Sequence, residues 1–514
     1  MSSAHNANLS RLLDWNLARR PDHEALVDGD RRWSYAQLHH DVNALAAGLA
    51  AHELRARDVV ALLGLNSADY LIACLAVSKL GAIFVPLNYR LHEEELHYLL
   101  GHSDATMLLA DGEYDELAAR LVASSPGVST RFVLAEDAVR QTATEVTVPS
   151  VRQLIDAHRG ELVPDAVVAP DDLQRILYTS GTTSRPKGAM LTHGNVTWNM
   201  IVQAAELSLT PRERVLNFAP MYHVGGLDIP GFGTWYAGAT MVVLRRFDPK
   251  TILDWVGAER ITGMVMVATM VHMIRELPGW ERFDTSSVRW MIFSQVVESL
   301  YRETQRIFPN TALMEGYGLT ETCNGVSYLH VNATEEKLGS VGVPLAHTDL
   351  RVVDDADRPV PPGELGEVTV RGPKVSPGYW KDEEATVLAH RGGWFHTGDV
   401  GCFDADGYLY IVDRKKDMIR SGGENVASSE IERVLYELDG VSEAAVVGIT
   451  DQRWGEVPKA FIVCRDGYQL GEDEIIAHCR SRLAGFKTPK VVQLVSALPR
   501  NPTGKVLKRE LRDW

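Results

Sequence analysis

Residues 178–188 read YTSGTTSRPKG, and this stretch is the most informative part of the 514-residue chain. It extends the apolar run Ile176–Tyr178 and combines several hydroxyl residues with two glycines and one lysine, Lys187. Glycine lets the main chain approach a ligand closely. Hydroxyl and amide groups donate hydrogen bonds to phosphate oxygens, and a lysine adds a point charge. The composition predicts a loop that holds nucleotide phosphates, with a solvated linker as the alternative that composition alone leaves open.

The overall composition is that of an ordinary globular protein, with 45% hydrophobic and 23% charged residues. A chain of this length exceeds one hydrophobic core, so we expect two or more domains. The formal net charge of −16 argues against general binding to nucleic acid or anionic lipid. We see no stretch of about 20 apolar residues that would span a membrane. The first residues, MSSAHNANLS, carry no secretory signal, so we expect a cytoplasmic protein.

The cysteines are few and scattered, and none forms a CxxC pair. This spacing predicts neither a structural zinc site nor a disulfide framework, and it favours reduced cysteines. The five positions are Cys74, Cys323, Cys402, Cys464 and Cys479.

Apolar runs alternate with helical patterns over the first part of the chain, which predicts βαβ units and a mostly parallel sheet. Residues 111–170 have a weaker pattern, and we expect them to be peripheral and rich in loops. The expected strands are Val59–Leu65, Ile83–Leu87, Met107–Ala110, Arg175–Tyr178, Val215–Phe218, Thr240–Leu244, Gly263–Ala268, Arg289–Phe293 and Thr311–Met314, with a helix at Tyr70–Leu80.

From about residue 340 the composition changes. Gly and Pro residues become frequent and separate short apolar runs such as Leu350–Val353 and Glu367–Val370. This predicts a compact β region. A small α+β domain is expected to start near Lys416. Its first helix has a candidate capping box formed by Ser429 and Glu432, and one apolar face. That face consists of Ile431, Val434, Leu435 and Leu438.

One further block contains residue types whose possible binding roles can be predicted from their chemistry. Residues 315–321 read EGYGLTE, in which Tyr317 can stack on a base, Thr320 can hydrogen-bond a phosphate and Glu321 can hold Mg²⁺ through oxygen. A strand-to-loop turn with an exposed glutamate is the alternative. The remaining blocks are APMYHVGG at 219–226, WFHTGDV at 394–400, DRKKD at 413–417, SGGEN at 421–425 and PRNPTGK at 499–505.

Taken together, these blocks resemble the adenylate-forming superfamily, which includes acyl- and aryl-CoA synthetases, adenylation domains of peptide synthetases and firefly luciferase. The loop at 178–188 differs from an ordinary P-loop because Lys187 follows Pro186 and precedes Gly188. It resembles the superfamily signature TSGTTGxPKG, with Ser184 in place of a glycine. A second departure is the stretch MIFSQVVES at 291–299, which lacks the usual glycines and proline of the adenine-lining segment.

The resemblance implies an α/β fold with a large N-terminal domain of βαβ lobes and a β-rich subdomain at 1–413. A hinge at 414–417 and a small mobile α+β lid at 418–514 would follow. Lys416 falls at the hinge position, and Gly422 and Gly423 would let the lid approach the pantetheine arm of CoA. Lys505 would be the lid lysine that reaches the α-phosphate and the attacking carboxylate.

The resemblance also implies an ATP and AMP site, with Lys505, Thr320 and His223 as the residues closest to the chemistry and Glu321 as the metal ligand. Asp399 and Arg414 would bind the ribose, and Ser294 and Gln295 would contact the adenine. The remaining nucleotide-binding residues would be Thr179, Ser180, Gly181, Thr182, Thr183, Lys187 and Tyr317.

The acyl pocket can be assigned only through the same resemblance. His223 would gate the approach to the carboxylate, and Gly225 and Gly226 would leave room for substrate bulk. The other candidates are Trp235, Thr269, Met270, Gly316, Leu319, Cys323, Asn324 and Val326. Because no Arg or Lys is among them, we expect a bulky apolar monocarboxylic acid: aromatic, terpenoid or medium-to-long aliphatic (fatty).

The sequence therefore predicts an ATP-dependent acid:CoA ligase that uses Mg²⁺. The acid would attack the α-phosphorus of ATP to give acyl-AMP and pyrophosphate, and the thiol of CoA would then displace AMP. Three alternatives stay open: a split-function member that performs one half-reaction, a non-catalytic nucleotide-binding protein, and carrier-protein pantetheine as the thiol. A homodimer is an assembly to be tested.

Overall fold

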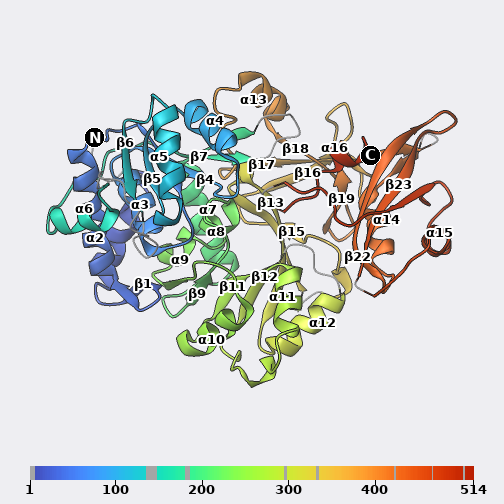
Figure 1. Cartoon of the computed structure of the whole chain (residues 1–514), viewed down its shortest axis with the longest axis horizontal. Coiled ribbons are helices and arrows are strands. Elements are labelled where there is room, and N and C mark those ends of the chain that lie inside the picture. The colour runs from blue at the N-terminus through green and yellow to red at the C-terminus, as the bar shows by residue number, and fades with distance from the viewer. Residues whose placement is uncertain are drawn as a thin grey trace. The chain divides into compact units, whose positions relative to one another are not determined.

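The computed structural model describes residues 6–134, 148–179, 186–293, 298–331, 335–421, 424–465, 467–501 and 504–514. The chain divides into two compact units (Figure 1). The first unit comprises Met1–Leu350 and Val370–Phe395, and the second comprises Arg351–Thr369 and His396–Trp514. Among the described residues, no helix is both long and apolar enough to cross a bilayer.

A six-stranded sheet forms the amino-terminal part of the first unit, with strand order β6-β5-β3-β4-β7-β8 among the described residues. Its neighbouring strands run parallel, except that β7 and β8 form an antiparallel hairpin. The strands are β3 (Val59–Leu63), β4 (Ile83–Leu87), β5 (Ala105–Ala110), β6 (Thr130–Val133), β7 (Leu173–Thr179) and β8 (Lys187–Thr192).

This sheet is covered on both faces, which explains why its strands read as continuous apolar runs. In β3, Val60 and Leu62 join the core with α2 (Tyr35–Ala51) and α3 (Ala68–Lys79). The alternate residues of β3 pack with α4 (Glu93–Ser103) and α5 (Asp115–Ser124). The expected parallel α/β arrangement is confirmed.

A nine-stranded sheet forms the rest of the first unit, in the order β15-β14-β13-β12-β11-β9-β10-β1-β2 among the described residues. Its centre is parallel, and its two ends are antiparallel. The strands are β1 (Glu24–Asp28), β2 (Arg31–Ser34), β9 (Arg214–Asn217), β10 (Thr240–Val243), β11 (Gly263–Val265), β12 (Trp290–Phe293), β13 (Ala312–Leu319), β14 (Asn324–His330) and β15 (Val343–Pro344).

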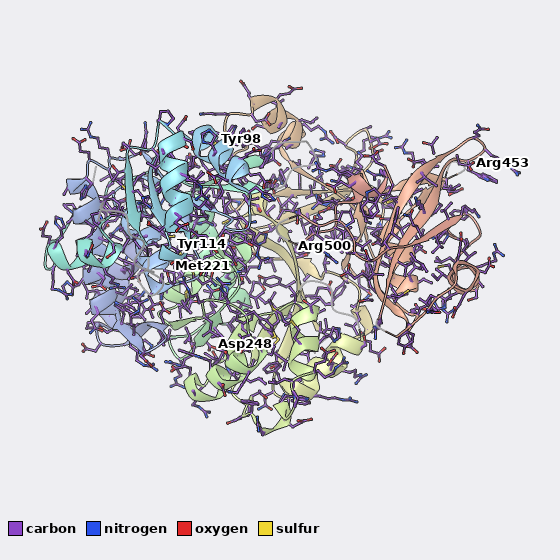
Figure 2. All side chains as sticks on the ribbon, in the orientation of Figure 1. Tyr98, Tyr114, Met221, Asp248, Arg453 and Arg500 are labelled. Carbon is purple, nitrogen blue, oxygen red and sulfur yellow. The ribbon has the colours of Figure 1, made fainter. Side chains whose placement is uncertain are left out.

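Several helices of the first unit begin at a hydroxyl or carboxylate side chain that accepts a backbone hydrogen bond, as N-caps do. Asp248, for example, accepts from the backbone N of Thr251 at 2.8 Å at the start of α10 (Figure 2). The remaining helices of this unit are α1 (Arg11–Arg19), α6 (Val151–Ala157), α7 (His193–Glu206), α8 (Val224–Asp228), α9 (Phe232–Tyr236), α10 (Pro249–Glu259), α11 (Ala268–Arg275), α12 (Glu298–Ile307) and α13 (Glu383–Ala389).

The second unit is built on two sheets. One has the order β16-β17-β18-β19, and the other has the order β21-β20-β23-β22 with β24 beside β23, among the described residues. Three helices complete the unit: α14 (Ser428–Leu435), α15 (Glu472–Arg480) and α16 (Lys508–Leu511). The strands are β16 (Asp349–Val353), β17 (Gly366–Arg371), β18 (Phe395–Phe403), β19 (Leu409–Arg414), β20 (Ile419–Ser421), β21 (Glu424–Val426), β22 (Val441–Asp451), β23 (Gly455–Cys464) and β24 (Val491–Leu494).

Two local predictions were wrong. Residues 111–170 contain α5, β6 and α6, and β6 joins the sheet beside β5. The predicted capping box of Ser429 and Glu432 does not form, because the Ser429 hydroxyl donates to the carbonyl of Val412. Asp413 caps α14 instead, accepting the backbone N–H of Ser428 at 2.6 Å. A cap from a distant strand leaves no local signal in the sequence.

The apolar face of α14 is as predicted, since Ile431, Val434 and Leu435 are buried in the core of the second unit. The division of the chain differs in one respect from the predicted domains. Residues 351–369 and 396–413 cluster with the carboxyl-terminal residues rather than with the first unit. Rotation of a lid about residues 414–417 stays a prediction.

Candidate functional site

The predicted phosphate loop connects the two strands of the β7–β8 hairpin. Thr179 pairs with Lys187, and Tyr178 pairs with Gly188, so the hairpin closes just before the loop begins. Residues 378–380 continue the pairing on β8, because Trp380 donates its backbone N–H to the carbonyl of Gly188 at 2.8 Å. The loop residues Ser180, Gly181, Thr182 and Thr183 lie outside the described residues. Ser294 and Gln295 lie outside them as well.

Lys187 and Glu321 come together through Tyr379, a residue that the sequence analysis missed. The ammonium of Lys187 lies 5.2 Å from the centroid of the Tyr379 ring, within the range of a cation–π contact. The Tyr379 hydroxyl donates to Oε1 of Glu321 at 2.8 Å. Lys187 also lies 4.0 Å from the carboxylate of Asp382.

The signal for Tyr379 was present in the sequence SPGYW at 376–380, but we interpreted its Pro-Gly pair as turn punctuation. The structure shows why this stretch folds against the site. The backbone N–H of Ser376 donates to the carbonyl of Glu321 at 2.7 Å, and Tyr379 forms an antiparallel bridge with Ala189 of β8. A tyrosine thus joins the Lys187 strand to the Glu321 turn.

Glu321 fits the metal role predicted for it. Its side chain is largely buried, and it supplies carboxylate oxygen, the ligand type that Mg²⁺ prefers. Among the described residues, there is no cluster of three or more His, Cys, Asp or Glu that could hold a metal alone. Mg²⁺ commonly takes only one or two carboxylates and completes its shell with water and phosphate. The two observations are therefore compatible.

The motif 315–321 occupies the end of β13 and a short 3-10 turn at Thr320–Thr322. Tyr317 is half-buried opposite Ser327 of β14, and Thr320 is also half-buried. Gly318 is required by the hairpin, since a Cβ there would lie 2.3 Å from the carbonyl oxygen of Asn324. A Cβ at Gly316 would lie 2.9 Å from the Tyr328 ring, so packing explains this glycine too.

His223 stands at the N-terminus of α8. Its Nδ1 accepts a hydrogen bond from the backbone N–H of Gly225 at 3.0 Å. The pKa of His223 is lowered by desolvation, although the side chain is accessible to solvent. Desolvation and solvent accessibility are compatible if the His223 ring lies in a recess, where protein atoms surround it but leave part of its surface open to solvent. In the neutral ring the proton is then on Nε2, which is a donor.

The packing of the main chain explains why residue 226 is a glycine, a reason other than the predicted room for substrate bulk. A Cβ at this position would lie 2.4 Å from the carbonyl oxygen of Pro220 and 2.5 Å from that of Ala219. The close approach of these two carbonyls by itself requires a glycine at this position, and the proximity of Gly226 to a substrate stays a prediction. At Gly225 the nearest atom to an added Cβ would be Nδ1 of His223, at 3.2 Å.

The other acyl-pocket candidates fall into two groups. Trp235 is fully buried and donates its indole N–H to the carbonyl of Ala25 at 2.8 Å, so it is a core residue in this structure. Cys323 is also fully buried, and burial raises the pKa of its thiol to about 12. Asn324 and Val326 are buried too. The partly or fully accessible candidates are Thr269, Met270 and Leu319.

In the second unit, Asp399 and Arg414 are paired in register on β18 and β19. Nε of Arg414 lies 2.5 Å from the Asp399 carboxylate. Lys505 is exposed on a tight turn, where its backbone N–H donates to the side chain of Asn501 at 2.8 Å. The pKa of Lys505 is lowered by desolvation and then by the charges of Arg414 and Lys416, while Asp399 opposes this shift.

Lys416 lies in the turn after β19, and its carbonyl accepts a hydrogen bond from Arg512 at 2.9 Å. Arg512 also pairs with Asp417 at 3.0 Å. Gly422 and Gly423 lie outside the described residues, between β20 and β21, where Ser421 pairs with Glu424. The second unit therefore brings Asp399, Arg414 and Lys505 into one electrostatic cluster.

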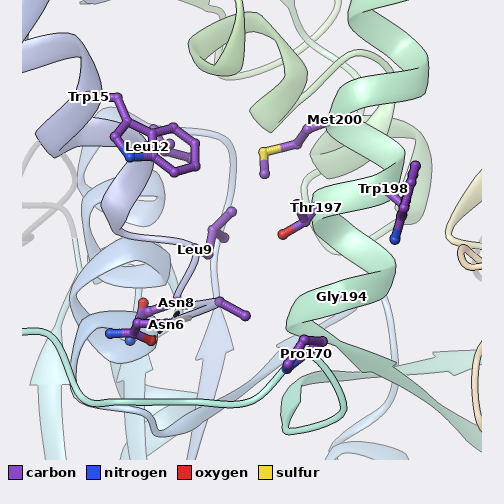
Figure 3. Close-up of a pocket in the computed structure, with 11 residues that line it drawn as sticks. Asn6, Asn8, Leu9, Leu12, Trp15, Pro170, Gly194, Thr197, Trp198 and Met200 are labelled. Carbon is purple, nitrogen blue, oxygen red and sulfur yellow. Dashed lines mark hydrogen bonds between the residues drawn. The ribbon is translucent and has the colours of Figure 1, made fainter. Parts of the chain in front are cut away.

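A small pocket lies apart from these motifs, between α1 and α7 (Figure 3). It has a volume of about 180 Å³, and its lining is mainly apolar. The residues that line it are Asn6, Ala7, Asn8, Leu9, Leu12, Trp15, Pro170, Gly194, Thr197, Trp198 and Met200. None of the predicted site residues is among them.

The two-unit fold and the motifs at the strand ends define the class: an adenylate-forming enzyme with a large α/β unit and a small α+β unit. The chain belongs to the AMP-binding enzyme family. The profile of this family matches residues 13–380, and that of the AMP-binding enzyme C-terminal domain matches residues 430–505.

Curated relatives place the chain in the acyl- and aryl-CoA ligase branch. It is 41% identical to feruloyl-CoA synthase from Amycolatopsis sp. over 96% of each chain. It is 37% identical to indoleacetate–CoA ligase from Aromatoleum aromaticum (strain DSM 19018 / LMG 30748 / EbN1), over 98% of this chain and 97% of that one. The protein is accordingly an AMP-forming acid–thiol ligase.

A solved structure of a CoA synthetase supports the same family and fold. The o-succinylbenzoate coenzyme A synthetase from Bacillus subtilis, in complex with ATP and a magnesium ion, superposes with a TM-score of 0.86 at 30% identity. The match covers 98% of this chain and 99% of the other. ATP and magnesium are thus bound by a relative with the same fold.

Proposed function

We propose that this acid–CoA ligase activates a bulky apolar monocarboxylic acid, and that aromatic acids are its preferred class. The acyl-pocket candidates that are partly or fully accessible include no Arg or Lys to pair with a second carboxylate; they are His223, Gly225, Thr269, Met270, Gly316 and Leu319. The two relatives named above are, by their names, ligases of aromatic acids at 41% and 37% identity. Both lines of support favour an aryl or arylalkyl acid over a dicarboxylic acid.

The observation that carries the adenylation step is the cluster of Lys505, Asp399 and Arg414 within the second unit. We assign the ribose hydroxyls to Asp399, because an ionised carboxylate accepts their hydrogen bonds. The positive charges of Arg414 and Lys416 contribute to lowering the pKa of Lys505. An anion bound beside Lys505 would therefore stabilise its ammonium form. The α-phosphate and the attacking carboxylate would supply that anion.

In the first unit, the hairpin loop of Thr179–Thr183 and Lys187 would hold the β- and γ-phosphates. Glu321 would ligate Mg²⁺, which neutralises phosphate charge when bound. Tyr317 would stack on the adenine, Thr320 would hydrogen-bond the α-phosphate, and the region of Ser294 and Gln295 would contact the base. Nε2–H of His223 is free of the Gly225 contact and would donate to the substrate carboxylate.

For the thioester step, we propose that the lid rotates about Lys416 and that Gly422 and Gly423 then approach the pantetheine arm of CoA. One site would thereby serve two nucleophiles in turn, as two-state closures do in other enzymes.

A panel of acids tests these assignments in two assays. ATP–pyrophosphate exchange reports acyl-AMP formation, and consumption of CoA thiol reports the second step. We expect both activities, with the highest kcat/KM for aromatic acids such as cinnamates and arylacetates. Exchange without thiol consumption would identify a split-function enzyme, and pantetheinylated carrier protein would then be tried as the acceptor. ATP binding without either activity would identify a non-catalytic protein.

A further inference from the structure

A fully buried charge pair lies behind the site. Arg175 is on β7, four residues before Thr179, and its side chain has no exposed surface. Its Nη2 contacts both carboxylate oxygens of Asp228 at 2.5 Å, and Asp228 is 1% exposed. Burying two ionised groups is costly, and replacing such a pair with apolar residues is often neutral or stabilising. Stability is therefore a weak explanation for the pair.

Asp228 is the last residue of α8, the short helix that His223 begins. Its backbone carbonyl accepts two hydrogen bonds, one from the side chain of Asn199 at 3.0 Å and one from that of Asn324 at 2.9 Å. The carboxylate of Asp228 is thus held from β7, while its carbonyl is held from α7 and from the start of β14. The carboxyl end of the His223 helix is therefore held by hydrogen bonds from three segments of the chain.

The turn that follows Glu321 is attached to the same pair. Nη2 of Arg175 lies 3.8 Å from Sγ of Cys323, and Cys323 has a left-handed backbone with φ of 46°. Lys374, which is 2% exposed, donates its ammonium to the carbonyl of Gly325 at 2.5 Å. The residues 323–325 are thus held by Arg175, Asp228 and Lys374 immediately after the proposed metal ligand.

The pair joins three segments that are far apart in the sequence: the strand leading into the phosphate loop, the His223 helix and the Glu321 turn. We propose that Arg175 and Asp228 are positioning residues for acyl-AMP formation, which fix these three segments relative to one another from behind the site. Neither residue is placed among those that contact the substrates. The proposal rests on the proposed function, because it assumes that the three segments act in one adenylation reaction.

The test compares two buried carboxylates. Asp228→Asn removes the charge that holds Arg175 and keeps the shape of the side chain. The matched control is Glu213→Gln. Glu213 is also buried, with 3% side-chain exposure, and pairs with Arg289, but it precedes β9 at the end of the strand opposite to the APMYHVGG block. Both changes leave an arginine without its carboxylate. Because the Arg289 side chain is 53% exposed whereas that of Arg175 is fully buried, we expect Asp228→Asn to lower the urea midpoint of unfolding more than Glu213→Gln does.

The rates are measured by acid-dependent pyrophosphate exchange at a temperature where circular dichroism shows each variant fully folded. Displacement of reacting groups by about 1 Å costs up to about 100-fold in rate, so we expect kcat of Asp228→Asn to fall by about 10- to 100-fold. The KM for ATP should change by less than about threefold, because the groups that touch ATP remain. Glu213→Gln should keep the kcat of the unmodified chain.

A double variant separates positioning from stability. Arg175→Met with Asp228→Leu replaces the pair with apolar side chains and should recover the urea midpoint lost in Asp228→Asn. Under the proposal its kcat stays low, because the carboxylate that held the three segments is gone. Recovery of kcat together with stability would overturn the proposal, as would equal kcat in Asp228→Asn and Glu213→Gln. Absence of exchange by the unmodified chain with every acid would count against the proposed function instead.

Discussion

The two units use a lysine in opposite ways. In the first unit, Lys374 is buried, and its ammonium donates a hydrogen bond to the carbonyl of Gly325. In the second unit, Lys505 is exposed on a turn, and its pKa is lowered first by desolvation and then by the charges of Arg414 and Lys416, against the opposing charges of Asp399 and Asp417. A lysine fixed by a carbonyl maintains structure. A lysine whose pKa is lowered by neighbouring cations is stabilised in its charged form when an anion binds beside it.

The largest expected effect follows from this second lysine. Lys505→Ala removes one preorganised positive charge from the developing anion, which typically costs about 10²–10³-fold in rate. We expect acyl-AMP formation, measured by pyrophosphate exchange, to slow by about that factor. Supplied with pre-formed acyl-AMP and CoA, the variant should make acyl-CoA at nearly the normal rate. A parallel collapse of the thioester step would show that Lys505 maintains structure, as Lys374 does.

The second prediction concerns Lys374 and stability. Burial lowers the pKa of Lys374 from 10.5 to about 8. The unfolded chain therefore binds more protons than the folded chain between these two pH values, and stability rises with pH across that window. Relative to Lys374→Met, the free energy of unfolding should gain roughly 2 kcal/mol between pH 7 and pH 9.5.

Urea unfolding of both proteins at a series of pH values measures this gain, since the contributions of the other groups largely cancel in the difference. A difference that is constant from pH 7 to pH 9.5 would mean that the buried lysine keeps the same protonation in both states. The contrast between the two lysines would then lose its physical basis.

The smallest expected effect concerns Tyr379, which links Lys187 to Glu321. Tyr379→Phe keeps the ring beside Lys187 and removes the hydroxyl that donates to Glu321. Loss of a group that orients a metal ligand typically costs about 10–100-fold in metal affinity. We expect the Mg²⁺ concentration for half-maximal exchange to rise by about tenfold, with kcat at saturating Mg²⁺ within about twofold.

Tyr379→Ala is the companion variant, because it also removes the ring from Lys187. It should raise the KM for ATP in addition to the Mg²⁺ requirement. If Tyr379→Phe leaves the Mg²⁺ requirement unchanged, then Glu321 is not the metal ligand or does not need Tyr379 to orient it.

The sequence predicted the elements of the parallel sheets well, since a strand buried on both faces must be apolar throughout. The range of β4 was predicted to the residue, and β3 and β5 to within two residues. The cap of α14 could not be predicted, because Asp413 reaches it from β19. The role of Gly226 was missed for the same reason, since the carbonyls that exclude a Cβ are brought there by the fold.

By itself, the sequence determined the parallel α/β architecture, because this depends on composition and periodicity along the chain. It also indicated the family, through the resemblance of its motifs and their order to those of known proteins. Only the tertiary structure decided which residues act together. Tyr379 beside Lys187 and Glu321, and Arg175 against Asp228, are contacts across 53 to 192 positions of sequence. Such contacts leave no local pattern, because burial and charge pairing are settled by the packing of distant segments against one another.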